Sequence, residues 1–168
     1  MSDDNALEMP ENGGSLSDSL SIEWTFLHFN ELTAAQWYEI SAARESVFIV
    51  EQKCPFLDAD GADIACWHLV GKVASEIAAY CRIVPPRLKY TEPSIGRVIT
   101  TLPYRTGGYG KALLAEALWH CDTMFPGLGN RIGAHMDLEK FYASFGYVTT
   151  SKPYDEDGIL HLEMVREN

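Results

Sequence analysis

A glycine-rich turn between an apolar, β-rich segment and an amphipathic helix constrains the fold of this chain more than any other feature. Residues 95–100 read Ile-Gly-Arg-Val-Ile-Thr, and a helix is predicted over residues 112–121. The turn between them contains Arg105, Thr106, Gly107, Gly108, Tyr109, Gly110 and Lys111. Backbone N–H groups at a helix N-terminus bind phosphate, and glycine lets a ligand approach the backbone closely. The pattern therefore predicts a strand–turn–helix unit that binds a phosphate-bearing coenzyme.

The spacing argues against two common phosphate motifs. A Walker P-loop needs glycine, four residues and then Gly-Lys-Ser/Thr. Here Arg105 stands at the first glycine position, and Ala112 follows Lys111. A dinucleotide fingerprint needs Gly-x-Gly-x-x-Gly, and Leu113 stands where its third glycine belongs. Nucleotide hydrolysis and dinucleotide binding are therefore not expected at this turn.

The pattern Arg105-x-x-Gly108-x-Gly110 resembles the coenzyme A loop of the GNAT superfamily of N-acetyltransferases. Downstream, residues 141–147 read Phe-Tyr-Ala-Ser-Phe-Gly-Tyr, which resembles a helix end that the superfamily carries in the same order. Further segments, at 47–55, 58–61, 95–98 and 154–164, are similar to the ElaA-like branch. The resemblance covers roughly residues 22–166.

This resemblance implies an α/β fold in which helices flank a mixed central sheet with splayed central strands. It implies acetyl-CoA as co-substrate, with the pantetheine arm along the strand edge formed by Val98, Ile99 and Thr100 and the pyrophosphate in the turn 105–111. The implied reaction is direct transfer of an acetyl group to a primary amine of a small molecule or peptide. No metal is expected to take part.

Tyr142 is the candidate general acid, because it matches the position of the superfamily's tyrosine. Its phenol would protonate the thiolate that leaves when the amine attacks the thioester. The other interpretation is packing alone, since Tyr142 shares an apolar helix face with Leu138, Phe141 and Phe145.

The general base is less narrowly indicated. Glu51 follows an apolar helix end, where burial would raise the pKa of its carboxyl, although a surface carboxylate is nearly as consistent with the pattern. His161 lies between Leu160 and Leu162 in a predicted strand, and alternation would turn it to the opposite face, toward the cleft. Many superfamily members carry asparagine where this chain has His135. An ordered water could also relay the proton and leave no single base.

Composition limits the classes of partner. The chain has 168 residues, 13 Lys and Arg, 24 Asp and Glu and a formal net charge of −11, so nucleic acid is not an expected partner. No apolar run approaches the length of a membrane span, and the N-terminus lacks a signal pattern, so a cytoplasmic protein with no membrane contact is expected. We expect an acidic disordered tail over residues 1–20 and one domain over 21–168. A homodimer is possible for the superfamily, although no segment indicates an interface.

Two other functions fit the same pattern. An acyl-homoserine-lactone synthase shares the core, but such enzymes usually lack the clear Arg105-x-x-Gly108-x-Gly110 loop. A non-catalytic acyl-CoA-binding module would keep the loop without turnover. The acidic run Asp58-x-Asp60-Gly61-x-Asp63 lacks the glutamate of a calcium loop, and a turn or a set of carboxylates that receives a cationic amine is favoured. Structural pairing with an acid is favoured for Arg97.

Alternation and turn residues predict the following strands: 22–28, 67–71, 76–84, 94–101, 130–135, 146–150 and 160–164. Thr33 is predicted to cap a helix that ends before Pro55, and a short helix is predicted over 138–145. The four cysteines, 54, 66, 81 and 121, are expected to be free thiols, because none has disulfide or zinc spacing.

Overall fold

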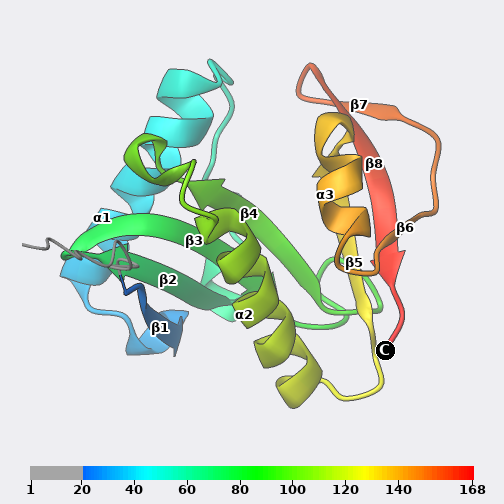
Figure 1. The fold of residues 1–168 in the computed structure, drawn as a ribbon, viewed down its shortest axis with the longest axis horizontal. Coiled ribbons are helices and arrows are strands. Elements are labelled where there is room, and N and C mark those ends of the chain that lie inside the picture. The colour runs from blue at the N-terminus through cyan, green and yellow to red at the C-terminus, as the bar shows by residue number, and fades with distance from the viewer. Residues whose placement is uncertain (1–20) are drawn as a thin grey trace, which may run out of the picture.

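The computed structural model describes residues 21–168, and the predicted tail over residues 1–20 lies outside that range. The described strands are β1 (Glu23–His28), β2 (Trp67–Val73), β3 (Glu76–Val84), β4 (Ser94–Thr100), β5 (Asn130–His135), β6 (Val148–Thr149), β7 (Tyr154–Glu156) and β8 (Ile159–Arg166). The α-helices are α1 (Ala34–Glu45), α2 (Tyr109–Met124) and α3 (Glu139–Ala143) (Figure 1).

The strands form two antiparallel sheets that meet at β4 and β5. One sheet has the order β1-β2-β3-β4, and the other has the order β5-β8-β6 with β7 also paired to β8. The N–H of Arg131 donates to the carbonyl of Pro93 at 3.0 Å, which joins the starts of β4 and β5. From there the two strands run in the same direction and diverge (Figure 1). The predicted splay of the central strands is thus confirmed. Within each of the two sheets every pair of neighbouring strands is antiparallel.

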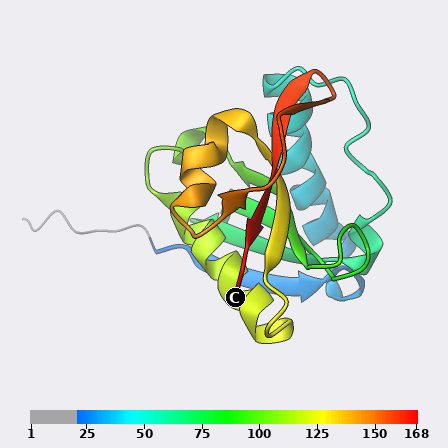
Figure 2. The same ribbon diagram turned by 90° about the vertical axis from the view of Figure 1, so that its right-hand side faces the viewer.

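Helices cover both faces of the β1–β4 sheet, with α1 on one side and α2 on the other (Figure 2). The side chains of β3 alternate between two cores, as a strand buried on both faces requires. Tyr80 packs in the core beneath α1 with Ile40, whereas Cys81 and Ile83 pack in the core beneath α2 with Leu114. This packing fixes β3 and thereby its partner β4.

The helix that begins after Thr33 continues further than a regular α-helix. Thr33 accepts a hydrogen bond from the N–H of Gln36, and the Gln36 side chain accepts from the N–H of Thr33, which makes the predicted N-cap a capping box. After α1, the chain forms a π-helical turn over Ser46–Glu51. Such widened turns are rare and occur most often near functional sites. This one carries Phe48, which lies beside residues of both β4 and β5, and Glu51, which contacts Arg105.

Several predicted boundaries differ from the structure. The helix after the glycine turn spans 109–124 rather than 112–121, because it begins inside the turn, and α3 is shorter than predicted because a 3₁₀ turn, Met136–Leu138, precedes it. The short strand β7 was not predicted. It has only three residues, two of them acidic and exposed, so no alternation marks it.

Candidate active site

The glycine turn presents the N-terminus of α2 at the end of β4. Gly108 adopts a left-handed conformation, with φ of 78°, directly before α2. A Cβ on Gly107 would lie 2.4 Å from the ring of Tyr109, so only glycine leaves room for that ring. The first N–H groups of a helix have no intrahelical acceptor and can bind an anion. The turn thus leads into the N-terminus of a 16-residue helix, and phosphate binding by residues 105–111 stays a prediction.

Arg105 connects the turn to two other elements. Its Nη1 and Nη2 contact the two carboxylate oxygens of Glu51 at 2.5 and 2.7 Å, and its Nε donates to the carbonyl of Thr100 at 3.1 Å. The hydrogen bond from Arg105 lowers the pKa of Glu51, and the carboxylate is exposed. The expected rise in the Glu51 pKa by burial is therefore wrong. Glu51 is positioned to orient Arg105.

A cavity separates the diverging strands; we call it the inter-strand cavity. Its walls come from residues 94–98 of β4, residues 133–135 of β5, and Tyr142 of α3. Within β4, the Ile99 side chain is buried in the core beneath α1, and Val98 and Thr100 are half-buried. Of the three residues of the predicted coenzyme edge, Val98 lines this cavity, and a role of Ile99 and Thr100 stays a prediction.

Tyr142 is 6% exposed, and its hydroxyl has no hydrogen-bond partner within residues 21–168. Burial raises the pKa of this phenol to about 12. Tyr142 therefore keeps its proton at neutral pH and has it available for donation into the inter-strand cavity.

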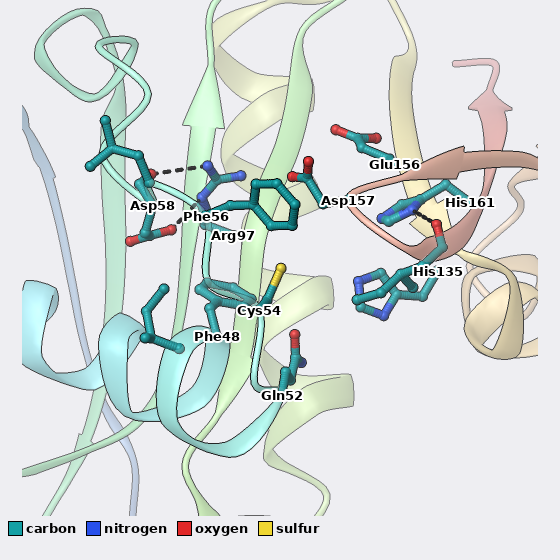
Figure 3. A pocket seen from close by; sticks show the side chains of 13 residues that line it. Phe48, Gln52, Cys54, Phe56, Asp58, Arg97, His135, Glu156, Asp157 and His161 are labelled. Atoms are coloured by element: carbon teal, nitrogen blue, oxygen red, sulfur yellow. Dashed lines mark hydrogen bonds and ion pairs between the residues drawn. The ribbon is translucent and has the colours of Figure 1, made fainter.

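A second cavity, which we call the outer cavity, adjoins the first. It is lined by the π-helical turn and the loop after it, by Arg97, and by the β7–β8 turn (Figure 3). The two cavities share these residues: Phe48, Gln52, Arg97, His135, Glu156 and His161. The shared residues mark one junction at which two ligands could meet.

His161 and His135 stand at this junction because they are direct partners in the β5–β8 ladder. Their rings make an edge-to-face contact with 4.6 Å between centroids. Nδ1 of His161 lies 2.9 Å from the carbonyl of Ile159, and a carbonyl only accepts, so Nδ1 carries the proton. In the neutral ring, Nε2 is then an unprotonated acceptor. Desolvation, and then the neighbouring His161, lower the pKa of His135.

The acidic run after Pro55 does not present free carboxylates. Asp58, Asp60 and Asp63 each contact two arginines. Their interpretation as a receiving set for a cationic amine is therefore wrong, and the structural pairing expected of Arg97 is confirmed. No sequence signal identified which arginines would pair with them, since the partners lie 14 to 39 residues away.

Across residues 21–168, no group of three or more His, Cys, Asp or Glu side chains is arranged to hold a metal ion. In the same range, no helix has both the length and the apolar character needed to cross a bilayer.

Comparisons with known proteins agree with this geometry. The acetyltransferase (GNAT) domain family matches residues 68–168. The chain belongs to the GNAT family. It is 38% identical to protein ElaA of Escherichia coli over 148 residues, which cover 87% of this chain and 97% of ElaA. It is also 38% identical to a UPF0039 protein of Synechocystis sp. over 147 residues, covering 87% and 96% of the two chains.

Solved structures support the same assignment of this GNAT protein. The crystal structure of E. coli ElaA superposes with a TM-score of 0.83 at 37% identity and covers 88% of this chain and 100% of ElaA. An acyl-CoA N-acyltransferase from Pseudomonas aeruginosa superposes with the same TM-score at 32% identity, covering 87% and 99%. A CoA-dependent acyl-homoserine lactone synthase, BjaI, shares the fold with a TM-score of 0.69 at 12% identity, covering 88% of this chain and 84% of BjaI.

Proposed function

We propose that this protein is an acetyl-CoA-dependent N-acetyltransferase that acetylates a primary amine of a small molecule or peptide. One observation carries the proposal: the glycine turn at the start of α2 follows β4, and residues 94–98 of β4 line the cavity that separates β4 from β5. The coenzyme's pyrophosphate would accept hydrogen bonds from the turn, and its arm would extend along β4 into the cavity.

Two residues would move protons: His161 at the junction and Tyr142 in the wall of the inter-strand cavity. A free alkylamine has a pKa of about 10 and must lose a proton before it attacks the thioester. Nε2 of His161 would take that proton while Nδ1 remains bonded to Ile159. As the carbon–sulfur bond breaks, the Tyr142 hydroxyl would donate to the leaving thiolate. Glu51 is not the base in this scheme, because Arg105 holds it as a carboxylate of lowered pKa.

The outer cavity would receive the amine. Its apolar walls include Phe48, Phe56 and Ile159, which suit the carbon body of the acceptor. Glu156 and Asp157 line the same cavity from the β7–β8 turn and would attract the cationic form of the amine (Figure 3). The order of events is thus attraction as an ammonium ion, deprotonation at His161 and attack at the junction.

Calorimetric titration with acetyl-CoA tests the proposal. Gly110→Glu places a negative charge in the turn, and a Cβ there is 3.7 Å from its nearest neighbour, so the fold should tolerate it. Ala115→Glu adds the same charge on an exposed position of the same helix and is the matched control. We expect tight binding by wild type and Ala115→Glu, and none by Gly110→Glu.

Turnover separates the remaining functions. Free-thiol release with an amine panel would support the transferase. Binding without release would favour a non-catalytic acyl-CoA module. An absence of wild-type binding would contradict the proposal and direct attention to other acyl donors, including acylated carrier protein.

A further inference from the structure

Six charged side chains beside the candidate site form a closed ring in which arginine and aspartate alternate. In order around the ring, the N–O distances are Arg97–Asp58 2.8 Å, Asp58–Arg44 2.7 Å, Arg44–Asp63 2.7 Å, Asp63–Arg82 2.8 Å, Arg82–Asp60 2.7 Å and Asp60–Arg97 3.3 Å. Three positive and three negative charges balance. The ring joins α1, the loop 58–63, β3 and β4.

The ring is buried on one side and open on the other. The side chains of Arg44 and Arg82 are 1% and 5% exposed, whereas that of Arg97 is 29% exposed. A charge this deeply buried is stable only while it is paired and hydrogen-bonded. The buried members therefore hold Asp58 and Asp60 in place, and these two carboxylates in turn hold Arg97.

Arg97 occupies an irregular position in β4. Tyr80 pairs with Ile99 and Arg82 pairs with Gly96, so one residue of β3 faces two residues of β4, which is a β-bulge. Arg97 is one of these two, and its φ is 52°, in the left-handed region that residues with a Cβ rarely adopt. Such a conformation persists only where the surroundings impose it.

The contacts of the Arg97 guanidinium supply that constraint. Its Nε donates to Asp58 at 2.8 Å, and its Nη2 donates to the Asp58 carbonyl at 3.0 Å (Figure 3). The same Nη2 donates to Asp60 at 3.3 Å. Val98, the other bulge residue, begins the strand edge beside the inter-strand cavity. The side chain at one bulge position is thus anchored while the next residue faces the candidate coenzyme path.

We propose that Arg97 is a positioning residue, through which the Arg–Asp ring holds the bulge in β4 in the conformation that aligns Val98 and Ile99 with the acyl-CoA arm. This inference rests on the proposed function for its ligand. It assigns Arg97 a role in backbone geometry rather than a contact with the substrate.

A pair of substitutions separates these two roles. Arg97→Ala removes the guanidinium and keeps a Cβ at the left-handed position. Arg97→Gly removes the same group but tolerates φ of 52° without strain. Arg131→Ala is the control, because Arg131 lies on β5 outside the ring, pairs with Glu92 and Glu163, and is 27% exposed. The readouts are acetyl-CoA affinity by calorimetry, the KM for acetyl-CoA against kcat, and the amide ¹H–¹⁵N shifts of Val98 and Ile99 without ligand.

We expect Arg97→Ala to weaken acetyl-CoA binding at least tenfold, to raise the KM for acetyl-CoA more than it lowers kcat, and to move both amide shifts. Arg97→Gly should stay within about threefold of wild type, and Arg131→Ala should match wild type. Equal losses in Arg97→Ala and Arg97→Gly would overturn the proposal in favour of direct ligand contact by the guanidinium.

The same experiments distinguish a failure of the proposed function from a failure of the inference about Arg97. If wild type does not bind acetyl-CoA, the proposed function is wrong, and the amide shifts still test the ring. Unchanged Val98 and Ile99 shifts in Arg97→Ala would then show that the ring does not hold the bulge and would overturn the inference.

Discussion

Two buried tyrosines near the site have different surroundings and therefore different expected roles. The Tyr147 hydroxyl donates to Oδ1 of Asn130 at 2.6 Å and completes a buried polar pair. The Tyr142 hydroxyl has no such partner within residues 21–168, and its side chain lines the inter-strand cavity. A hydroxyl in a cavity wall that has no partner in the surrounding packing is free to donate to a ligand.

Removing the Tyr142 hydroxyl should therefore separate turnover from stability. We expect Tyr142→Phe to lower kcat by about 10²–10⁴ fold, the usual contribution of a proton donor, with acetyl-CoA affinity nearly unchanged. Tyr147→Phe is the control: it should cost about 1–2 kcal/mol of unfolding free energy, because Asn130 loses its partner, and leave kcat alone. Steady-state kinetics and urea unfolding measure both. Normal turnover by Tyr142→Phe would remove Tyr142 as the acid.

The proposed role of His161 as the base that deprotonates the acceptor amine can be tested by the pH dependence of kcat/KM. In His161→Asn, the amide nitrogen can still donate to the Ile159 carbonyl, but the atom that corresponds to Nε2 is gone. We expect kcat/KM to fall by about 10²–10⁴ fold at neutral pH. The defect should shrink as the pH approaches about 10, because the free amine then loses its proton without a base. A defect of the same size at every pH would contradict the assignment.

The control for this variant is His120→Asn. His120 stacks on Phe26, with 3.7 Å between ring centroids, and lines neither cavity. Its substitution should leave the pH profile of kcat/KM unchanged.

At the scale of elements, the sequence predicted the β2–β3 hairpin but not the exact turn that connects its two strands. Val73 pairs with Glu76, so Ala74 and Ser75 form a two-residue loop. Their φ angles of 47° and 73° are those of a type I′ turn, for which Asn-Gly is preferred. The alternating strands predicted the hairpin, but neither Ala nor Ser is typical of this turn.

Replacing Ala74 with Asn and Ser75 with Gly should therefore stabilise the protein. Relief of two left-handed residues should raise the unfolding free energy by about 1 kcal/mol. For a chain of this length, that corresponds to an increase in Tm of about 2–4 °C. Differential scanning calorimetry measures the change, and Ala74→Val, which is more strained at positive φ, should lower Tm. An unchanged Tm in both variants would argue against the left-handed turn.

The elements that the sequence predicted are those with a periodic pattern or a cap. Alternation located β3 and β5, Thr33 located the start of α1, and Gly108 located the start of α2 within a few residues. Patterns that depend on distant partners were not predictable. The Arg97 side chain, at the bulge in β4, contacts residues 37 to 39 positions away. The Glu51 pKa likewise depends on Arg105, 54 residues later.

At the scale of the whole molecule, the candidate site lies where the two sheets meet. The apolar core beneath α2 and the Arg–Asp ring lie on opposite faces of the sheet at this point. The apolar core beneath α2 includes the side chains of β5 and β8 as well as those of β2 and β3. The Arg–Asp ring ties α1 and the loop 58–63 to the other face of β3 and β4. Both systems meet at β4, so the position of the candidate coenzyme edge depends on each of them.

The Arg–Asp ring should make the stability of the protein sensitive to acid. Burial opposes ionisation of Asp60 and Asp63, but hydrogen bonds from arginines outweigh it and hold both pKa values below the ordinary value. Because the unfolded-state pKa of an aspartate is about 3.9, the stabilisation is fully present above that pH. It is lost as the pH falls through the lower, folded-state pKa values, since the unfolded chain then binds more protons.

Urea unfolding between pH 7 and pH 2.5 tests this expectation. The unfolding free energy of the wild type should decline steeply below about pH 4. Asp60→Asn should be about 1–2 kcal/mol less stable at pH 7, since Arg82 loses a charged partner, and should decline less steeply below pH 4. Asp122→Asn removes an arginine-paired carboxylate outside the ring and corrects for the general effect of losing an acid. If Asp60→Asn runs parallel to wild type across the whole range, the ring carboxylate does not carry the acid sensitivity, and the decline belongs to carboxylates elsewhere in the molecule.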